Sequence, residues 1–312
     1  MKSLFVIDPP HRLDEASDTS IALMRETVRR GGDVEVCTPD DLCLNERGDL
    51  EVDTRVIEVR DGRDWFSVSG AHTHAVSNYD VVWMRKDPPF DLQYFHSTLL
   101  LSHAPPSVLI VNAASALREA NEKLYALRFP ELCPETIVTG SVQKLVDFRD
   151  RVGGRIVVKP IHDAGGRGVF RITAGDENAD AILDAATAQE TRRVVGQRYL
   201  PQVRDGDKRI ILVEGRPVGA VLRVPQPGEL RANLHVGGSP VRTSLSDRDL
   251  EICGRIGPVL SGLGVVFAGI DVIGDYLTEI NITSPTGIRE IHRIDGVRLE
   301  TNILDAVERR LR

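Results

Sequence analysis

The sequence predicts an α/β protein of more than one domain that begins with a parallel sheet. An apolar run at residues 4–7, a helical stretch at 20–30 and a second apolar run at 34–37 follow one another with short connections. Strand, helix and strand in this order are typical of a parallel sheet. The length of 312 residues suits two or three small domains, each able to bury a core.

The composition favours a cytoplasmic globular protein without a membrane or nucleic-acid partner. Hydrophobic residues make up 41% and charged residues 27%, and the net charge of −7 argues against nucleic-acid binding. No apolar run reaches the length of a membrane span, and Asp8 with two prolines comes too early for a signal peptide. The four cysteines form no C-x-x-C pair, so we expect reduced thiols, with neither disulfides nor a zinc site.

The N-terminal part should present polar residues at one edge of its sheet. Residues 45–75 are polar and turn-rich and are predicted to form an edge hairpin, and apolar strands are predicted at 81–84 and 108–111. Ligands of open parallel sheets collect at the carboxyl ends of the strands. Such ends hold Asp8, the run Arg85-Lys86-Asp87, and Asn112.

The rest of the chain should form two more units. A helix at 117–129 leads to Pro134, followed by strands at 136–138, 155–160, 169–172 and 194–200 with helices at 142–151 and 179–188. Strands at 209–213 and 218–223 are joined by a tight turn at Glu214-Gly215. Helices around 252–263 and 299–311 each place apolar residues on one face.

The segment 265–281 is a candidate metal site. A turn at Gly274-Asp275 joins its two short strands, and alternation puts Glu279 and Asn281 on the same face. If the strands pair, Asp271 lies near both. Two carboxylates and an amide suit Mg²⁺, whose other positions are filled by substrate phosphates. Taken alone, the pattern is more typical of an ordinary hairpin with a polar face.

The glycine-rich segment HDAGGRGVFRI, residues 162–172, comes after Lys159-Pro160, and its loop connects two predicted strands. Glycines let backbone N–H groups approach phosphate oxygens closely, and a lysine at the end of an apolar strand can direct its charge at a phosphate. Neither the P-loop nor the dinucleotide fingerprint is present. A plain turn and a lysine that reaches water are the alternatives.

Polar residues elsewhere allow a binding role or a plain structural one. The segment 197–201 could read the edge of a purine or could simply end a strand. Arg209 follows a charged turn and could face a developing negative charge, although such turns are usually solvated.

Two loops carry the same ambiguity. The loop at 84–91 is rigid and charged, which suits it to gripping carboxylates or to a stiff surface role. The Gly- and Pro-rich loop at 224–240, with Arg231 and Asn233, is either a lid that excludes water or a plain connection.

The sequence resembles the bacterial glutathione synthetases of the ATP-grasp superfamily over nearly its whole length. The resemblance rests on MRKDPPFD (84–91), NEKLYALRFPELCPET (121–136), VVKP (157–160), the glycine loop, DGDKRI (205–210), RANLHVGG (231–238), GIDVIGD (269–275) and LTEINITSPTGIREI (277–291). The first and the last two are the most specific. Arg167 in the glycine loop and Gly287, where some relatives have a cysteine, depart from the family pattern and bear on substrate fit.

The resemblance implies an ATP-grasp fold preceded by an N-terminal parallel-sheet domain. That domain spans 1–120, a central lid domain spans 121–201, and a C-terminal domain with the metal site spans 202–312, with ATP between the last two. The resemblance implies that Lys123 and Lys159 contact the ATP phosphates, that Gly165-Gly166 covers them, that Gln197, Tyr199 and Leu200 border the adenine, and that Asp207 lies close to the ribose. It implies that Mg²⁺ (or Mn²⁺) is held by Asp271, Glu279 and Asn281. The implied substrate-binding residues are Asp8, Arg85, Lys86, Arg223, Arg231, Asn233 and Ser284.

The implied reaction joins γ-glutamylcysteine to glycine while ATP is cleaved to ADP and phosphate. The cysteinyl carboxylate attacks the γ-phosphate, and the glycine amine then attacks the acyl phosphate. Lys159 and Arg209 are the expected catalytic residues, with Arg209 facing the acyl phosphate and the tetrahedral oxyanion. The resemblance also implies a homo-oligomer, specifically a tetramer.

Three other functions fit parts of the sequence. Another ATP-grasp carboxylate–amine ligase would share the chemistry, but the 84–91 loop argues against it. A nucleotide-binding regulator without turnover would be expected to lose metal ligands such as Asp271 and Glu279 first. A nicotinamide oxidoreductase lacks its glycine fingerprint after Ile7, where Asp8-Pro9-Pro10 stands.

Overall fold

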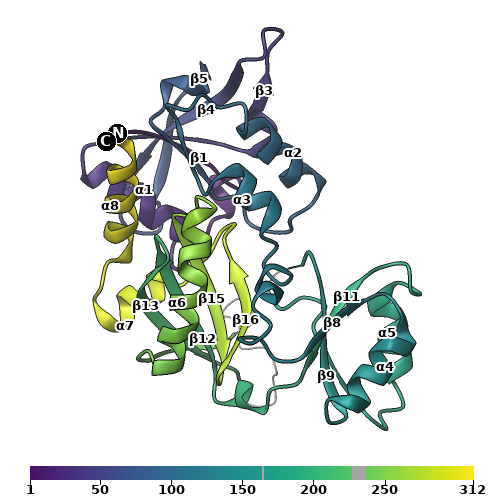
Figure 1. The fold of residues 1–312 in the computed structure, drawn as a ribbon. Helices are drawn as coiled ribbons and strands as arrows, with labels where there is room; N and C mark the ends of the chain where they lie inside the picture. The colour runs from purple at the N-terminus through teal and green to yellow at the C-terminus, as the bar shows by residue number, and fades with distance from the viewer. Residues whose placement is uncertain (164, 227–236) are drawn as a thin grey trace.

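The computed structural model describes residues 1–163, 165–226 and 237–312. Figure 1 shows three parts: an N-terminal sheet with its helices, a C-terminal sheet packed below it, and a central domain that stands to one side as its own lobe. Within the described ranges, none of the helices has the length and apolar character needed to cross a membrane.

The centre of the N-terminal sheet is parallel, as predicted. Strands β2 (Asp33–Cys37), β1 (Lys2–Val6), β6 (Val81–Met84) and β7 (Leu109–Val111) lie side by side in this order. Helix α1 (Thr19–Arg29) connects β1 to β2 and begins where the Asp18 side chain accepts hydrogen bonds from the N–H groups of Ser20 and Ile21.

The predicted edge hairpin is also present. It consists of β4 (Leu50–Val59) and β5 (Phe66–Ala75), and β4 also pairs antiparallel with β2 and with β3 (Leu42–Leu44). Among the described strands, β5 pairs with β4 alone, so it forms the outer edge of the sheet. The short 3₁₀ helices of this part are η1 (Pro10–Arg12), η2 (Pro39–Asp41) and η3 (Val76–Asn78).

Helix α2 (Leu92–Leu101) was not predicted. Its sequence, LQYFHSTLLL, has apolar residues on every side, so it shows no helical period. Tyr94 and Leu101 are buried against the sheet, while Leu92 and Leu99 remain exposed.

The prediction of a single helix at 117–129 is wrong. The chain forms the short helix α3 (Ala114–Glu119), then a turn, then the 3₁₀ helix η4 (Tyr125–Arg128). The side-chain oxygen of Asn121 accepts hydrogen bonds from the N–H groups of Lys123 and Leu124, both at 3.1 Å. Such a side-chain turn competes with the helix for these backbone groups.

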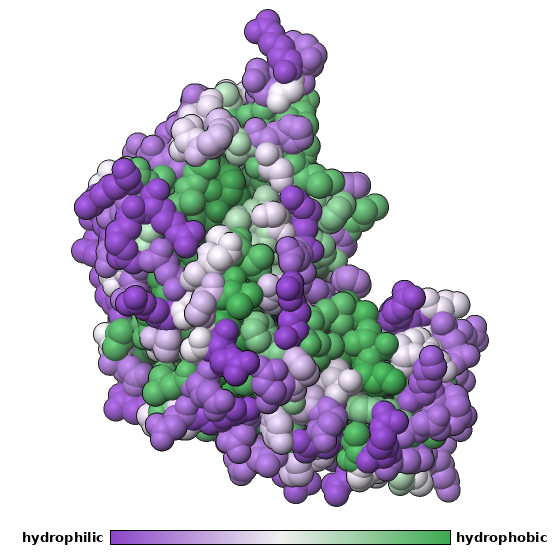
Figure 2. All heavy atoms as spheres, viewed as in Figure 1, coloured by the Kyte–Doolittle hydropathy of each residue, from purple (hydrophilic) through white to green (hydrophobic). Residues whose placement is uncertain are grey.

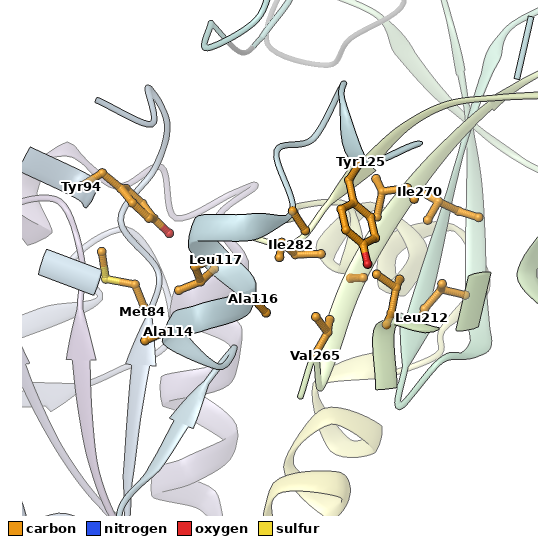
Figure 3. Packing of buried hydrophobic residues seen from close by; sticks show 14 of the residues in the cluster. Met84, Tyr94, Ala114, Ala116, Leu117, Tyr125, Leu212, Val265, Ile270 and Ile282 are labelled. Atoms are coloured by element: carbon orange, nitrogen blue, oxygen red, sulfur yellow. The ribbon is translucent and has the colours of Figure 1, made fainter. Parts of the chain in front are cut away.

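This broken segment joins the N-terminal and C-terminal parts through one continuous core. Figure 3 shows Leu117 of α3 next to Met84 and Tyr94, while Tyr125 of η4 packs toward Ile270 of the C-terminal sheet. All five side chains are almost fully buried.

The central domain has a core of its own. Its strands run in the order β10 (Phe170–Thr173), β9 (Arg155–Pro160), β11 (Val194–Arg198) and β8 (Thr136–Thr139), all antiparallel. Helices α4 (Val142–Arg151) and α5 (Ala179–Thr187) cover one face and bury Leu145, Phe148 and Leu183 against Ile156. All six elements match the predicted ones to within a few residues.

The C-terminal sheet is antiparallel. Its strands run in the order β14 (Ser239–Arg242), β13 (Arg216–Val224), β12 (Asp207–Val213), β15 (Phe267–Ile273) and β16 (Tyr276–Asn281), and the 3₁₀ helix η5 (Pro201–Arg204) precedes β12. Helix α6 (Asp247–Gly262) lies across it, and Gly257 of this helix touches Gly215 in the β12–β13 turn. A Cβ on Gly257 would lie 2.1 Å from the Gly215 carbonyl oxygen, so only glycine fits there.

The end of the chain returns to the N-terminal part. Helix α7 (Ile288–Asp295), which was not predicted, leads into α8 (Leu299–Leu311). Ile303 and Val307 of α8 share a core with Phe5, Ile21 and Trp83. Figure 1 shows α8 beside α1, with the two chain termini close together.

Candidate active site

A cleft with about 990 Å³ of open space lies between the central domain and the C-terminal sheet. It is lined by Glu122, Lys123, Val157, Lys159, Asp163, Gly165, Gly166, Val169, Gln197, Arg198, Tyr199, Leu200, Val203, Asp207, Arg223, Asp271, Ile273, Thr278 and Glu279. All of the residues predicted to contact ATP are among them, together with two of the three predicted metal ligands.

Two lysines place positive charge in this cleft. Alternation along β9 buries Ile156 and Val158 in the domain core and turns Lys159 toward the cleft. The Lys159 Nζ donates a hydrogen bond to Gln197 Oε1 at 3.1 Å and lies 3.8 Å from Glu279 Oε1. After β9 the chain enters the glycine loop, where Gly165 and Gly166 have φ of +70° and +76°.

Lys123 is buried and lies on the turn after Asn121. Its Nζ pairs with the Glu122 carboxylate and donates to the Asp163 carbonyl at 2.7 Å. Burial alone would lower the pKa of Lys123, but Glu279 and Glu122 outweigh it and raise that pKa. The cleft therefore keeps a buried ammonium group charged at the start of the glycine loop.

The residues at the end of β11 give the cleft an apolar wall next to one polar side chain, Gln197. Tyr199 and Leu200 are buried at the cleft wall, and the guanidinium carbons of Arg155 and Arg171 lie 6.0 and 5.9 Å from the Tyr199 ring centre. Gln197 accepts from Lys159 and donates to Thr136 Oγ1 at 3.1 Å, so in this structure its side chain positions Lys159.

Strand register builds a network of alternating charges across the C-terminal sheet. Arg209 of β12 stands opposite Asp271 of β15, and Asp207 of β12 stands opposite Arg223 of β13. The Arg209 Nε and Nη2 donate to Asp271 Oδ1 and Oδ2 at 2.5 and 2.9 Å. Arg223 Nη2 lies 2.6 Å from Asp207 Oδ2 and 3.0 Å from Asp271 Oδ1.

The network controls the charge of its two acids. Burial alone would raise the pKa of Asp271, but Arg209 and Arg223 hold it well below its usual range. Burial raises the pKa of Asp207 to about 6, because Arg223 compensates only in part and Asp271 adds negative charge. Asp271 is thus a stable anion at the floor of the cleft.

The β15–β16 hairpin pairs as predicted, with Asp271 opposite Glu279 and Asn281 two residues further on the same face. In one orientation of the Asn281 amide, its nitrogen lies 3.3 Å from Asp271 Oδ2. Only the reverse orientation gives both amide atoms a suitable partner: the nitrogen donates to Glu122 Oε2 at 3.1 Å and the oxygen accepts from Arg209 Nη2 at 3.3 Å.

The donors on this hairpin fit a hard divalent cation. Among the described residues, no three His, Cys, Asp or Glu side chains lie together as a ready cage, and the predicted set has two carboxylates and one amide oxygen. Mg²⁺ is commonly held by one or two carboxylates with phosphate oxygens and water completing the shell. Burial and then the negative charge of Glu279 raise the pKa of the neighbouring Glu122 to about 7, although Lys123 acts in the opposite direction.

Glu122 and Asp163 are the site residues that the sequence reasoning missed. Both lie next to motifs that were recognised, Lys123 and the glycine loop. Glu122 was assigned to a helix, and only the Asn121 turn brings it to the cleft, where its carbonyl accepts from the Ile280 N–H at 2.8 Å.

The predicted substrate residues of the N-terminal part form a separate group. Arg85 is buried, donates through Nε to Ser20 Oγ at 3.2 Å and through Nη2 to the Pro285 carbonyl at 3.1 Å. Ser284 Oγ donates to the Arg85 carbonyl at 3.2 Å, and Lys86 Nζ lies 3.1 Å from Asp8 Oδ1. These residues sit at the strand ends, as expected, but not on the wall of the main cleft. Arg231 and Asn233 lie outside the described residues.

A second, mostly apolar cavity of about 510 Å³ lies on the other side of Asn121 and Glu122. It is lined by Pro88, Phe90, Leu117, Arg118, Ala120, Asn121, Glu122, Ile161, His162, Ile282 and Thr283. The 84–91 loop and the segment before Ser284 thus both line this cavity. Figure 2 shows hydrophobic groups at the surface in the hollow where the central lobe meets the rest of the molecule.

Comparison with known proteins places this geometry in one family. Residues 1–118 match the family model "Prokaryotic glutathione synthetase, N-terminal domain", and residues 122–296 match "Prokaryotic glutathione synthetase, ATP-grasp domain". Glutathione synthetase of Gloeobacter violaceus is 45% identical over 98% of this chain and 96% of its own length. Glutathione synthetase of Brucella melitensis is 44% identical over 94% of each chain.

Solved structures with much lower identity share the fold. The crystal structure of the D-cycloserine synthetase DcsG matches with a TM-score of 0.67 at 16% identity, over 100% of this chain and 99% of that one. The RimK domain ATP-grasp protein of Sphaerobacter thermophilus matches with a TM-score of 0.64 at 17% identity, over 99% and 100%.

Proposed function

We propose a residue-by-residue account of catalysis for this chain, which belongs to the prokaryotic glutathione synthetase family. The protein is an ATP-grasp carbon–nitrogen ligase that joins γ-glutamylcysteine to glycine and releases glutathione, ADP and phosphate. It uses ATP and a divalent cation. The observation that carries the assignment of roles is the cleft that gathers Lys123, Lys159 and the Asp271–Glu279 pair from three separate parts of the chain.

ATP lies in this cleft with its adenine against Tyr199 and Leu200 and its ribose near Asp207. The phosphates extend toward Lys123 and Lys159 under the Gly165-Gly166 loop. Two ammonium groups and several backbone N–H groups then neutralise the phosphate charge, which is the main requirement of phosphoryl transfer. Gln197 supports this arrangement through its hydrogen bond to Lys159.

The divalent cation is Mg²⁺, with Mn²⁺ as a substitute, and Asp271, Glu279 and the oxygen of Asn281 hold it. When bound, such an ion neutralises the phosphate oxygens and keeps the transferred group in line. The carboxylates of Glu122, Asp271 and Glu279 all line this cleft, which supports a cation at this position.

The reaction proceeds in two displacements. A cysteinyl carboxylate oxygen attacks the γ-phosphorus, ADP leaves, and an acyl phosphate forms. The glycine amine attacks the acyl carbon, passes through a tetrahedral oxyanion and expels phosphate. Arg209 stabilises the negative charge of both stages, and its bidentate bond to Asp271 fixes the guanidinium in advance, so little reorganisation is needed.

The dipeptide approaches from the N-terminal side. Asp8, Arg85, Lys86 and Ser284 hold its charged groups, with Arg223 nearer the phosphates. Burial lowers the pKa of the Arg85 guanidinium, and in the described residues no carboxylate pairs with it directly, which supports a substrate carboxylate as its partner. The second cavity beside this group offers room for the uncharged part of the dipeptide.

The experiment that tests this function is an omission series. ADP release is measured with ATP, Mg²⁺, γ-glutamylcysteine and glycine, leaving out each in turn, and the product is weighed by mass spectrometry. We expect ADP formation to need all four, to yield glutathione and to disappear in Glu279→Ala. Turnover with a different amine alone would move the substrate assignment to another ligase, and bound ATP without turnover would favour a regulator.

We also propose that the protein is cytoplasmic and that the domains of each chain span 1–120, 121–201 and 202–312. We further propose that the protein forms a homo-oligomer, a tetramer. The outer edge of β5 supports assembly, because residues 66–75 carry no Asp, Glu, Lys, Arg or Pro, the residues that normally block pairing at a free edge. Two copies of β5 can pair antiparallel across a two-fold axis. Light scattering after gel filtration tests this, and Val68→Lys at the exposed edge should reduce the assembled mass. An unchanged mass would exclude β5 from the interface.

A further inference from the structure

We propose that Glu122 is a positioning residue that turns the Asn281 amide so that its oxygen faces the cation. The inference rests on the metal site proposed above and adds a residue that the reaction scheme does not use. The asymmetric amide of Asn281 has to be kept in the one orientation that can ligate a metal.

An asparagine can ligate a hard cation only through its oxygen, because the amide nitrogen carries protons and no free lone pair. Asn281 is next to Asp271, and the carboxylate of Asp271 attracts the amide N–H groups, as the 3.3 Å approach of Nδ2 to Oδ2 shows. That orientation would point N–H groups into the metal site. A competing acceptor on the other side of the amide is therefore needed.

Glu122 supplies that acceptor. With the amide reversed, its nitrogen donates to Glu122 Oε2 at 3.1 Å, and its oxygen accepts from Arg209 Nη2 at 3.3 Å. The oxygen then keeps a second lone pair for a cation. Because Oε1 is taken up by Lys123 Nζ, Oε2 is left as an acceptor for the amide nitrogen.

Glu122 is itself held in place by two contacts besides the one to Asn281. Its carbonyl accepts from the N–H of Ile280, the neighbour of Asn281, at 2.8 Å. Its Oε1 pairs with Lys123 Nζ, which also donates to the Asp163 carbonyl. The two carboxylate oxygens thus have separate tasks, Oε1 toward the lysine and Oε2 toward the amide, so the metal site and the phosphate site share one side chain.

This division of tasks makes a specific prediction for Glu122→Gln. Lys123 will bind the remaining oxygen of the glutamine, because an ammonium group needs an acceptor. The glutamine NH₂ then faces Asn281 and donates to its oxygen, which turns the amide nitrogen toward the cation. We expect Mn²⁺ to bind about tenfold to a hundredfold more weakly, the range typical of lost outer-shell partners.

The test is a double-mutant cycle with Asn281→Asp. A carboxylate has two equivalent oxygens and needs no orientation, so Glu122→Gln should leave Mn²⁺ binding unweakened in the Asn281→Asp background. Free Mn²⁺ is measured by electron paramagnetic resonance in titrations of each protein with Mn²⁺ and ADP. Glu119→Gln, a surface acid of the same segment that pairs with Arg128, serves as the matched control and should change nothing.

The outcomes separate this inference from the site on which it rests. Equal weakening by Glu122→Gln in both backgrounds, or none in the wild-type background, would overturn the positioning role. If Glu279→Ala leaves Mn²⁺ binding intact, the metal site itself is wrong. Should Glu122→Gln fail to fold by circular dichroism, Glu122→Met, which has similar length and no acceptor, replaces it in the same cycle, again with weaker binding expected only when Asn281 is present.

Discussion

The side chain of Asn112 binds both backbone groups of Phe267: its Nδ2 donates to the carbonyl at 2.7 Å, and its Oδ1 accepts from the N–H at 3.0 Å. The same amide also bonds the Ile282 carbonyl at 2.7 Å and the Val266 N–H at 2.8 Å. One buried side chain at the end of β7 thereby satisfies its full hydrogen-bonding capacity on β15 and on the segment after β16. Asn112 ties the N-terminal sheet to the C-terminal one and is not a ligand of the strand-end site.

Asn112→Ala should destabilise the protein by about 3 kcal/mol, because it leaves buried backbone groups unpaired. Urea unfolding followed by circular dichroism gives the free energy. The exposed Asn78, changed to alanine, is the control and should stay within about 0.5 kcal/mol of wild type. A loss below about 1 kcal/mol for Asn112→Ala would contradict the tie between the two sheets.

Two glycines of α6 should respond to alanine in opposite ways. Gly257→Ala forces a Cβ to 2.1 Å from the Gly215 carbonyl oxygen, and overpacking of this kind should cost about 3 kcal/mol. Gly254→Ala, one turn earlier with nothing within 4 Å of the new Cβ, should instead stabilise by about 0.5–1 kcal/mol through helix propensity. Thermal unfolding of the pair checks this, and an equal effect of both would refute the packing argument.

Arg209→Lys should lower kcat by about a hundredfold while leaving the KM for ATP within a few fold. The lysine keeps the charge but cannot form the bidentate pair with Asp271, so its charge is no longer fixed toward the acyl phosphate. Steady-state kinetics with each substrate varied measures the split. Arg248→Lys, at a surface contact with Glu251, is the control. A rise in KM with unchanged kcat would assign Arg209 to binding alone.

Low pH should lower the free energy of unfolding in part through protonation of Glu26. Burial alone would raise the pKa of this carboxyl, but Arg29, Arg30 and Arg298 outweigh it and lower the pKa below its ordinary value of 4.5. The unfolded chain therefore binds the proton first as the pH falls. The stability contributed by Glu26 is complete above about pH 4.5 and is lost as the pH falls through the folded pKa.

Glu26→Gln should be less stable than wild type at about pH 7, because three guanidinium groups lose a charged partner. It should also lose less stability than wild type between about pH 5 and about pH 3. Urea unfolding across this range measures both effects, with the exposed Glu251→Gln as control. Parallel pH profiles for Glu26→Gln and wild type would show that the cluster does not titrate with folding.

Much of the fold follows from local patterns in the sequence. The strand–helix–strand start, the six elements of the central domain and the β15–β16 hairpin were predicted because apolar period, glycine turns and alternation agree there. Helix α2 was missed because its apolar residues lie on every side of the helix and show no helical period. Helix α7 was missed because it is short and follows Gly287 without a side-chain cap.

The residues of the site also divide into those that local sequence patterns predict and those that they do not. Lys159 was found because it ends an apolar strand just before the glycine loop, and Glu279 because strand alternation puts it on the same face as Asn281. Glu122 depends instead on a turn that the Asn121 side chain imposes on a stretch expected to be helical. The pairing of Asp271 with Arg209 and Arg223 depends on the register of β15 against β12, and these two strands are distant in sequence, so local patterns do not contain it. The proposed site roles of these residues stay predictions for the experiments above.

The return of α8 to the N-terminal sheet sets the order in which the protein can mature during its synthesis. Phe5, Ile21 and Trp83 are made early, but Ile303 and Val307, which complete their core, leave the ribosome more than 200 residues later. The central domain closes its own core with residues that are all contained between 136 and 198. The middle of the chain can therefore fold while it is being translated, whereas the first domain must keep an apolar face open until α8 has been made.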